Sequence, residues 1–268
     1  MDVIMQEIIC LSSHSIILLI ATGAMVGFLL ALTGGGGSVI CVPLLLYVVK
    51  IPDIHKVIGT SAMAVAISAL FNLCAHARKG HVAWAKGLGV SSVAVLGALT
   101  GAALGKAIDG HYLLIPFALL MLVIASVMLR KNRTCTHPGA ADVITFPPAL
   151  VWSGVAGTGV MAGLLGIGGG FLVVPLLVWF FRLSLVSAIA TSLMVVFAMG
   201  MATSVSYALA GKISVSLTVW LIVGGLPGGM LGVTFANRLK KNEKTINTLF
   251  SVMLLLMASY MILQGLIH

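Results

Sequence analysis

Long apolar runs separated by short polar gaps make up most of the sequence. They cover about residues 16–32, 39–49, 57–75, 87–104, 112–129, 149–181, 185–209, 215–236 and 246–266. An α-helix that crosses the hydrocarbon core of a membrane needs about 20 consecutive, mainly apolar residues, and most of these runs approach that length. The pattern therefore predicts a polytopic, all-α membrane protein whose helices are joined mostly by short loops.

Glycines interrupt two of these runs. Residues 33–44 read TGGGGSVICVPL, and residues 166–176 read GIGGGFLVVPL. Glycine loses little by leaving a helix and readily adopts positive φ angles, so such a cluster ends a helix. In a bilayer, a break of this kind is tolerated only where protein buries the backbone or where the backbone lines a cavity. Two breaks at corresponding places in a membrane chain are typical of a transporter's binding site.

Residues of the same type recur at a fixed spacing along the chain. At an offset of 132 the matched pairs are Gly36/Gly168, Gly37/Gly169 and Pro43/Pro175, and at an offset of 131 they are Thr60/Thr191, Ser61/Ser192, Gly80/Gly211, Gly97/Gly228 and Gly101/Gly232. A single one-residue gap reconciles the two offsets, which indicates a duplication. We expect a first repeat in residues 1–133, a cytoplasmic linker in 134–147 and a second repeat in 148–268.

The basic residues indicate how the repeats cross the membrane, because Lys and Arg collect on the cytoplasmic side. If each glycine-broken run forms a hairpin and the N-terminus lies outside, eleven of the 15 Lys and Arg residues fall on the inner side. If each broken run crosses once, the best division is eight against seven. The hairpin interpretation gives each repeat five apolar segments, so the second repeat starts on the opposite side and is inverted.

The predicted fold therefore has two inverted repeats, each made of a glycine-broken helical hairpin plus three transmembrane helices. The second limbs of the hairpins have about 11 to 15 residues, and at about 1.5 Å per residue they fall short of a ~30 Å hydrocarbon core. The glycine tips should thus lie within the membrane, one entering from each face. Both termini are expected outside.

Composition and charge narrow the class further. The chain has 60% hydrophobic and 8% charged residues, whereas soluble domains have about 25% charged residues. Its net charge is +9, but the basic residues lie in the gaps between apolar runs, so we expect lipid headgroups and no nucleic acid as partner. The four cysteines form no C-x-x-C pair, and neither a metal site nor a cofactor is expected. No Lys or Arg occurs before Lys50, so the N-terminus lacks the basic region of a cleavable signal.

Some residues within the runs have a simpler structural interpretation. Gly97, Gly101 and Gly105 stand at four-residue spacing, and such a stripe of small residues lets a second helix approach closely. Asn72 lies in the middle of a run, where its amide is expected to hydrogen-bond to a neighbouring helix. His76 ends the same run beside basic residues, and an interfacial role is favoured over a proton relay.

The doubled pattern Gly-x-Gly-Gly-Gly-x-x-x-Val-Pro-Leu resembles the sulfite exporter TauE/SafE family of membrane permeases, also called TSUP or DUF81. The second copy, residues 166–176, matches closely, whereas the first has Gly35 at the intervening position and Ser38 in place of the last glycine. The resemblance covers essentially the whole chain. It implies a transporter, most naturally an exporter, of small sulfur-containing anions such as sulfite, thiosulfate or organosulfonates. It also implies a multi-pass protein of the cell membrane, which in a bacterium is the inner membrane.

The residues alone also favour an anion as substrate. The segments after both breaks begin helices, whose unpaired N–H groups and positive dipole ends attract negative charge. Hydroxyl donors on neighbouring runs add to these groups, and no Asp, Glu, Lys or Arg lies in the middle of a run. The candidate substrate-binding residues are Gly34, Gly35, Gly36, Gly37, Ser38, Thr60, Ser61, Gly166, Gly168, Gly169, Gly170, Thr191 and Ser192.

Several alternatives remain at this point. The glycines could serve only close helix packing, and the two Thr-Ser pairs could form only helix–helix hydrogen bonds. The favoured function is a secondary carrier, and the alternative is an anion channel with a glycine-lined constriction. An enzyme is not expected, because no run carries a His-x-x-x-His pair, a carboxylate pair or an activated nucleophile. The particular anion, the coupling ion and the formation of a homo-oligomer stay open.

Overall fold

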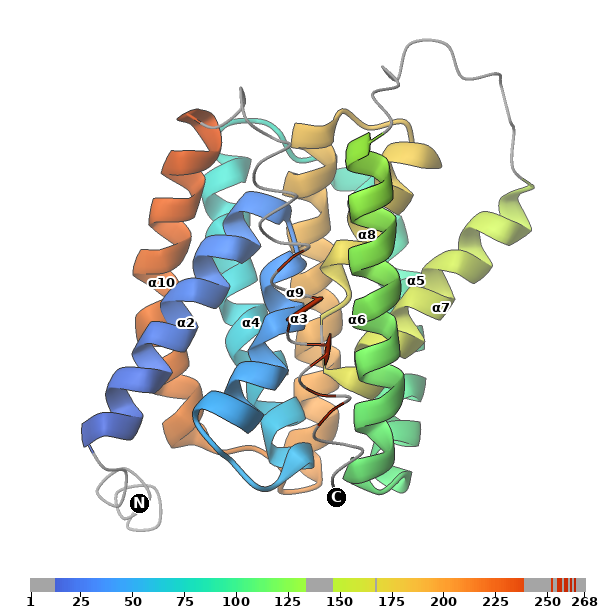
Figure 1. The fold of residues 1–268 in the computed structure, drawn as a ribbon. Helices are drawn as coiled ribbons and strands as arrows, with labels where there is room; N and C mark the ends of the chain where they lie inside the picture. The colour runs from blue at the N-terminus through green and yellow to red at the C-terminus, as the bar shows by residue number, and fades with distance from the viewer. Residues whose placement is uncertain are drawn as a thin grey trace.

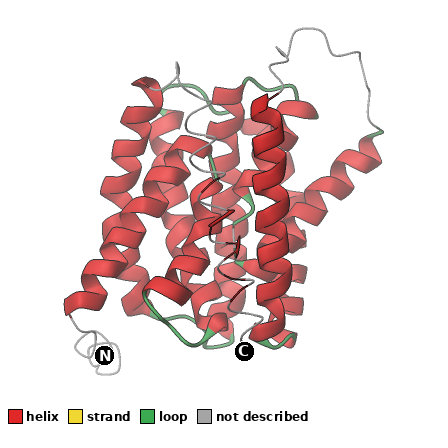
Figure 2. Ribbon diagram, in the orientation of Figure 1, coloured by secondary structure: helices red, strands yellow, loops and turns green. Residues whose placement is uncertain are grey.

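The computed structural model describes residues 13–133, 147–166, 168–238 and seven separate positions between 252 and 263. Its elements are α2 (Ser13–Thr33), α3 (Gly36–Pro43), the π-helix η1 (Leu44–Val48), α4 (Ile54–Ala77), α5 (Trp84–Ala107), α6 (Gly110–Arg133), α7 (Pro148–Leu165), α8 (Gly170–Trp179), α9 (Leu185–Leu209) and α10 (Val215–Arg238). The described residues contain no β-strand (Figure 2), and the expected all-α fold class is confirmed. Most of the predicted linker 134–147 and of the last run, 246–266, lies outside the described residues.

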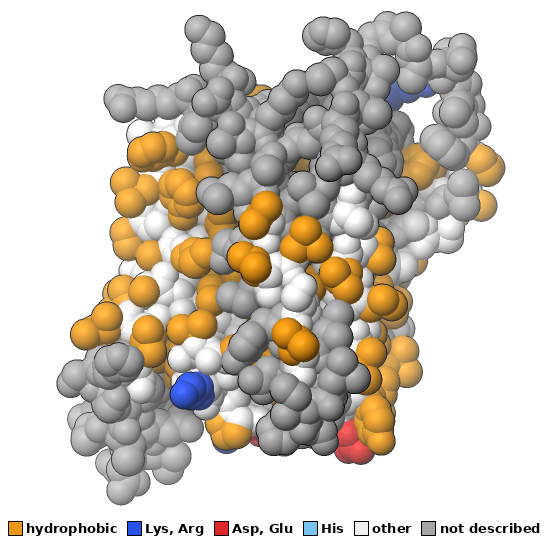
Figure 3. All heavy atoms as spheres, viewed as in Figure 1, with side chains coloured by type: hydrophobic (Ala, Val, Ile, Leu, Met, Phe, Trp, Pro, Cys, Tyr) orange, Lys and Arg blue, Asp and Glu red, His pale blue; other side chains and the backbone are white. Residues whose placement is uncertain are grey.

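Apolar side chains cover the outside of the helix bundle. Leu96, Leu119 and Met230 are 65%, 62% and 74% exposed. On the face drawn in Figure 3, hydrophobic side chains spread over the middle, and the Lys, Arg, Asp and Glu side chains that it colours lie toward the two ends. Five of the described helices, α2, α4, α5, α9 and α10, are long and apolar enough to cross a membrane. The surface and the helix lengths are those of a multi-pass membrane protein.

Both glycine breaks reverse the direction of the chain (Figure 1). The helix α2 rises from the lower end of the bundle in this view, and α3 returns toward the same end. The helix α7 descends from the upper end, and α8 turns back toward it. The short limb formed by α3 and η1 covers Gly36–Val48, which at about 1.5 Å per residue spans only about 20 Å.

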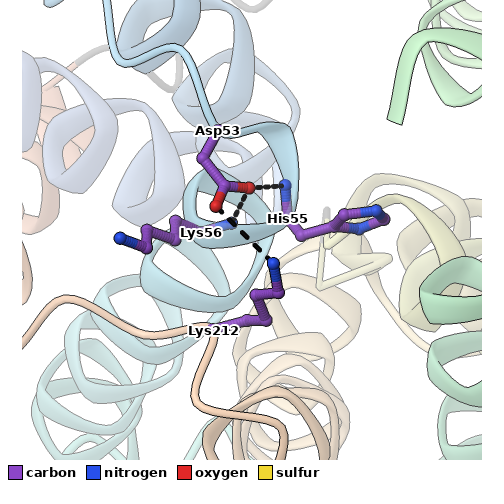
Figure 4. Close-up of polar contacts among 4 residues, drawn as sticks. All are labelled: Asp53, His55, Lys56 and Lys212. Carbon is purple, nitrogen blue, oxygen red and sulfur yellow. Dashed lines mark hydrogen bonds and ion pairs between the residues drawn. The ribbon is translucent and has the colours of Figure 1, made fainter. Parts of the chain in front are cut away.

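Polar contacts place the loops at two ends of the bundle. The carboxylate of Asp53, before α4, lies 3.7 Å from the Lys212 ammonium, before α10 (Figure 4). Lys106 Nζ donates to the carbonyl oxygen of Ser206 at this end, which we call the Lys212 end. At the opposite end, the Lys86 end, Lys86 Nζ donates to the carbonyl oxygen of Phe181. If each broken run crossed the membrane once, the loops before α4 and before α10 would lie on opposite sides, whereas hairpins bring them together.

Capping side chains set where the long helices begin. The Asp53 carboxylate accepts hydrogen bonds from the backbone N–H groups of His55 (3.0 Å) and Lys56 (3.2 Å). The Ser184 hydroxyl accepts one from Ser187 N at 3.3 Å, so α9 starts in a similar way. Because the first N–H groups of a helix have no intrahelical partner, such caps extend helices beyond the apolar run. The run 57–75 accordingly lies within the longer helix Ile54–Ala77.

The predicted stripes of small residues pack helices of opposite halves against one another. The helix α5 lies along α7, and α2 lies along α10. Methyl groups added to Gly97 and Gly101 would overlap the carbonyl oxygens of Ala156 and Val160 on α7. In the α2–α10 pair, a methyl group added to Gly228 on α10 would likewise overlap the carbonyl oxygen of Ala24 on α2. The close approach expected from these glycines is confirmed, and the partner in each case belongs to the other half of the chain.

A methyl group at this interface should therefore destabilise the bundle. We expect Gly163→Ala on α7 to lower the stability by about 1–3 kcal/mol, because its Cβ would overlap the backbone oxygen of Ala98. The matched control is Gly157→Ala on the same helix, where nothing lies within 4 Å of the added carbon. Thermal unfolding of the purified variants in detergent measures the difference. Equal melting temperatures for the two variants would contradict the close contact.

Candidate functional site

The first break joins α2 to α3 through a short turn of glycines. Gly34 has φ +74°, a conformation that favours glycine. The Thr33 hydroxyl donates to the carbonyl oxygen of Leu29 at 2.7 Å and accepts from the N–H of Gly36 at 2.8 Å. Thr33 thus closes one helix and caps the next. Ser38 Oγ donates to the carbonyl oxygen of Gly35 at 2.5 Å, inside the first turn of α3.

The second break is built from a run of left-handed residues. Gly166, Gly168 and Gly169 have φ values of +66°, +67° and +60°, and α8 begins directly after them. The carbonyl oxygen of Gly169 accepts from Leu172 N (3.1 Å) and Val173 N (3.2 Å), which starts the helix. Residues other than glycine rarely adopt positive φ angles, and here three residues out of four do so. The backbone conformation therefore explains why glycine is needed at these positions.

The two breaks touch each other in the middle of the bundle. A methyl group added to Gly170 would lie 2.6 Å from the Cα of Gly35 and 2.8 Å from the carbonyl oxygen of Gly34. A methyl group on Gly168 would lie 3.8 Å from the Cβ of Ser38. The glycines therefore bring two stretches of backbone, about 135 residues apart in sequence, into direct contact.

Helices α4 and α9 enclose this meeting point. The position of a methyl group on Gly168 is 3.4 Å from Val65 Cγ1 on α4 and 3.2 Å from Val196 Cγ1 on α9. Both valines are fully buried. They were missed by the sequence reasoning, although they coincide at the same offset of 131 residues that relates the Thr-Ser pairs.

Each break also packs against the central helix of the other half. Ser192 Oγ, on α9, lies 2.7 Å from the carbonyl oxygen of Gly34 and 2.8 Å from that of Ile189, and its single proton is shared between these two acceptors. On the other side, a methyl group at Gly166 would lie 2.6 Å from Ile58 Cγ2 on α4. Ser61 Oγ donates to the carbonyl oxygen of Ile58 at 3.0 Å. The predicted residues Ser61 and Ser192 therefore lie on the walls that hold the breaks.

Thr60 and Thr191 have a different position. The Thr60 hydroxyl accepts a hydrogen bond from the N–H of Ser214 at 3.2 Å, and the Thr191 hydroxyl accepts one from the N–H of Ala83 at 3.0 Å. Ser214 and Ala83 directly precede α10 and α5. Both threonines thus serve the start of a helix in the other half, and their hydrogen bonds join helices as the structural alternative expected.

This arrangement limits which groups can bind a ligand. The hydroxyl protons of Thr33, Ser38, Ser61 and Ser192 all go to backbone carbonyl oxygens. The remaining donors around the breaks are backbone N–H groups at the starts of α3 and α8, where the helix dipoles are positive. At the first break, the N–H groups of Gly34, Gly36 and Ser38 are already bonded, to Leu30 O, Thr33 Oγ1 and Gly35 O. Among the described residues, Asp, Glu, Lys and Arg stand near the helix ends and in the loops, so the polar groups at the breaks are uncharged hydroxyl, N–H and carbonyl groups.

A bundle of apolar helices with two broken helices at its centre defines the class as a polytopic membrane transporter. The chain belongs to the sulfite exporter TauE/SafE family, whose model matches residues 19–261. A probable membrane transporter protein of Xylella fastidiosa (strain Temecula1 / ATCC 700964) is 40% identical over 249 residues, which cover 93% of this chain and 95% of that protein.

Two relatives in Bacillus subtilis (strain 168) carry the same kind of name. The probable membrane transporter protein YunE is 27% identical over 271 residues, covering 94% of this chain and 98% of its own length. The probable membrane transporter protein YdhB is 27% identical over 228 residues, which cover 84% of this chain and 91% of that protein. No solved structure matches the chain. The family and the names of the relatives identify a membrane transporter of the TauE/SafE type.

Proposed function

We propose that this protein is a secondary transporter, and in its main direction an exporter, of small sulfur-containing anions such as sulfite, thiosulfate or organosulfonates. The anion is held by backbone N–H groups at the two glycine breaks. The observation that carries this proposal is the contact of Gly170 with Gly34 and Gly35 between α4 and α9. Two helix starts that meet within a membrane, without a carboxylate among them, favour an anion over a cation.

The proposed mechanism treats the two halves as inverted repeats, residues 1–133 and 148–268, joined by a cytoplasmic linker at 134–147. Equivalent contacts support this assignment: Thr191 accepts from Ala83 N as Thr60 accepts from Ser214 N. The first helix of each half also packs on the fourth helix of the other half. Rocking of one half against the other would expose the central anion to each face in turn.

Neutral donors suit a carrier because the anion must also leave. A buried ion pair between the anion and Lys or Arg would hold the anion tightly, whereas amide dipoles bind it with less free energy. Because the two breaks are in direct contact, their backbones leave no open path through the centre of the bundle. This favours a carrier over an open channel. The channel with a glycine-lined constriction remains the alternative that the experiment below would detect.

Transport assays on reconstituted vesicles test the proposal. We expect vesicles that contain the purified protein and unlabelled sulfite or thiosulfate to accumulate the corresponding ³⁵S-labelled anion from outside. This counterflow should saturate with concentration, as a carrier requires. Flux that rises linearly and shows no counterflow would support the channel instead. No specific flux of sulfite, thiosulfate, sulfate or taurine would overturn the proposed substrate class.

The topology gives a second expected result. Lys79 and Ala210 are both exposed, follow the ends of α4 and α9, and are related by the offset of 131. In a variant without the four native cysteines, we expect an impermeant maleimide to label Ala210→Cys in intact cells. Lys79→Cys should be labelled only after the membrane is permeabilised, because the Lys86 end is cytoplasmic. Labelling of Lys79→Cys in intact cells would contradict this orientation.

A further inference from the structure

A row of buried polar side chains follows one face of α4 toward the Lys86 end. Ser68, Asn72 and His76 stand at four-residue spacing, which places them on the same side of a helix. They are 4%, 4% and 7% exposed. We call these three residues the polar seam. They occupy a membrane-spanning helix, where polar side chains are rare and usually functional.

Glycines on α10 make room for the seam. A methyl group on Gly225 would lie 2.7 Å from Ser68 Oγ, and one on Gly229 would lie 2.6 Å from Asn72 Oδ1. The side chains of the seam therefore lie directly against the backbone of α10. Alanine at either position of α10 would displace them.

Hydrogen bonding within the described residues does not account for the nitrogens of Asn72 and His76. Within the described part of the chain, Asn72 Nδ2 and both ring nitrogens of His76 are buried without a partner. A residue that only joined two helices would be expected to donate to a group of its neighbour, as Ser192 Oγ does to the carbonyl oxygen of Gly34. Buried polar groups are expected to be paired, so these nitrogens indicate a ligand or water that completes the site.

The charges around the seam favour an anion. Arg78 and Lys79 directly follow the seam, and the rings of His76 and His81 are 6.4 Å apart. The acidic side chains of the described residues, Asp53 and Asp109, belong to the loops before α4 and after α5, at the Lys212 end. Amide and imidazole N–H donors next to cationic side chains suit the oxygen atoms of a small oxyanion.

The equivalent positions of the other half carry neither an amide nor an imidazole side chain. At the offset of 131, Met199, Thr203 and Tyr207 on α9 correspond to the seam, and Ala94 and Ala98 on α5 correspond to the two glycines of α10. Thr203 and Tyr207 are also buried, at 2% and 0% exposed, and Tyr207 Oη is also without a partner, so buried polar groups lie on both helices. What distinguishes the seam is its pair of nitrogen-bearing side chains, Asn72 and His76, beside the basic residues of the Lys86 end.

We propose that the polar seam is a second oxyanion-binding site, between the glycine breaks and the Lys86 end. Asn72 Nδ2 and His76 donate hydrogen bonds to the anion as it moves between the breaks and that face. The site takes the same small sulfur oxyanions as the breaks, and the inference thus rests on the proposed function. It differs from the central site because it faces only one side of the membrane.

The test compares the two faces in right-side-out and inside-out membrane vesicles. Labelling of Lys79→Cys identifies the orientation that exposes the Lys86 end. With ³⁵S-sulfite presented at that end, we expect Asn72→Leu and Asn72→Asp to raise the KM about tenfold or more, since each removes the amide donor. His76→Gln should raise it less. The KM for sulfite presented at the Lys212 end should stay at the wild-type value.

Ser91→Ala is the matched control, because Ser91 is also buried with an unpartnered hydroxyl and lies near the start of α5 at the Lys86 end. Its KM should stay unchanged at both faces. A wild-type KM at both faces in Asn72→Leu and His76→Gln would overturn the second site. An equal rise at both faces with a lower melting temperature would show a structural role and also overturn it. Absence of sulfite counterflow in wild-type vesicles would instead disprove the proposed function on which the site depends.

Discussion

Gly170→Ala is expected to reduce transport more than any other single methyl group in the bundle. The added carbon would overlap Val196 Cγ2 and lie 2.6 Å from the Cα of Gly35. Val196 is fully buried, and a β-branched side chain in a helix has one strongly preferred χ1 rotamer. The backbone of the first break cannot move without shifting α3. Overpacking of this kind costs about 1–3 kcal/mol, which corresponds to roughly 5- to 150-fold in the population of the state in which the breaks touch.

The initial rate of ³⁵S-sulfite counterflow in vesicles measures this effect. Gly154→Ala on α7 is the control, because nothing lies within 4 Å of its added carbon, and its rate should equal the wild-type rate. Melting temperatures of both proteins separate a transport defect from unfolding. A folded Gly170→Ala variant that transports at the wild-type rate would show that the contact between the breaks is not part of the transport cycle.

The hydrophobic pattern was sufficient to predict the long helices and their order. Because a transmembrane helix needs only an apolar stretch of adequate length, runs such as 87–104 identify α5 without information on its neighbours. The pattern missed the helix ends, since they depend on single capping residues. Asp53 extends α4 by three residues before the predicted start at 57, and this side chain looks like an ordinary loop residue in the sequence.

The site was only partly predictable for a physical reason. Four consecutive glycines predict a break in a helix whatever surrounds them. The partner of each break depends on how distant helices pack, and the contact of Gly170 with Gly35 has no signal in either segment alone. The duplication did contain one usable signal, because Val65 and Val196 coincide at the offset of the Thr-Ser pairs.

The sequence shows that Thr60 and Thr191 carry hydroxyl groups, but it does not show whether these groups donate or accept hydrogen bonds. Sequence reasoning treated Thr60 and Thr191 as donors to a substrate, and in the structure their oxygens accept hydrogen bonds from Ser214 N and Ala83 N. A hydroxyl is both donor and acceptor, so only the neighbouring atoms decide its use. A substrate role for the threonines therefore stays a prediction, and the backbone amides become the principal candidates for anion binding.

A charge placed at the second break should distinguish an anion site from a packing element. Gly169 precedes α8 with φ +60° and ψ 0°, a conformation that Asn and Asp tolerate better than other side chains. Asn and Asp have nearly the same shape, so the variants Gly169→Asn and Gly169→Asp should disturb the packing equally. Only the aspartate adds a negative charge at the helix N-terminus, where it would compete with the substrate for the same N–H groups.

We therefore expect Gly169→Asp to bind sulfite at least about tenfold more weakly than Gly169→Asn, because a carboxylate within a few ångströms repels the anion in a medium of low dielectric constant. Isothermal titration of purified, monodisperse variants measures the two affinities. Ala210→Asp and Ala210→Asn, in the exposed turn at the Lys212 end, control for the change in net charge and should bind alike. If the glycines serve packing alone, both Gly169 variants will express poorly to the same degree, and whatever folds will bind sulfite equally. Equal affinities in folded Gly169→Asp and Gly169→Asn would place the anion away from the start of α8.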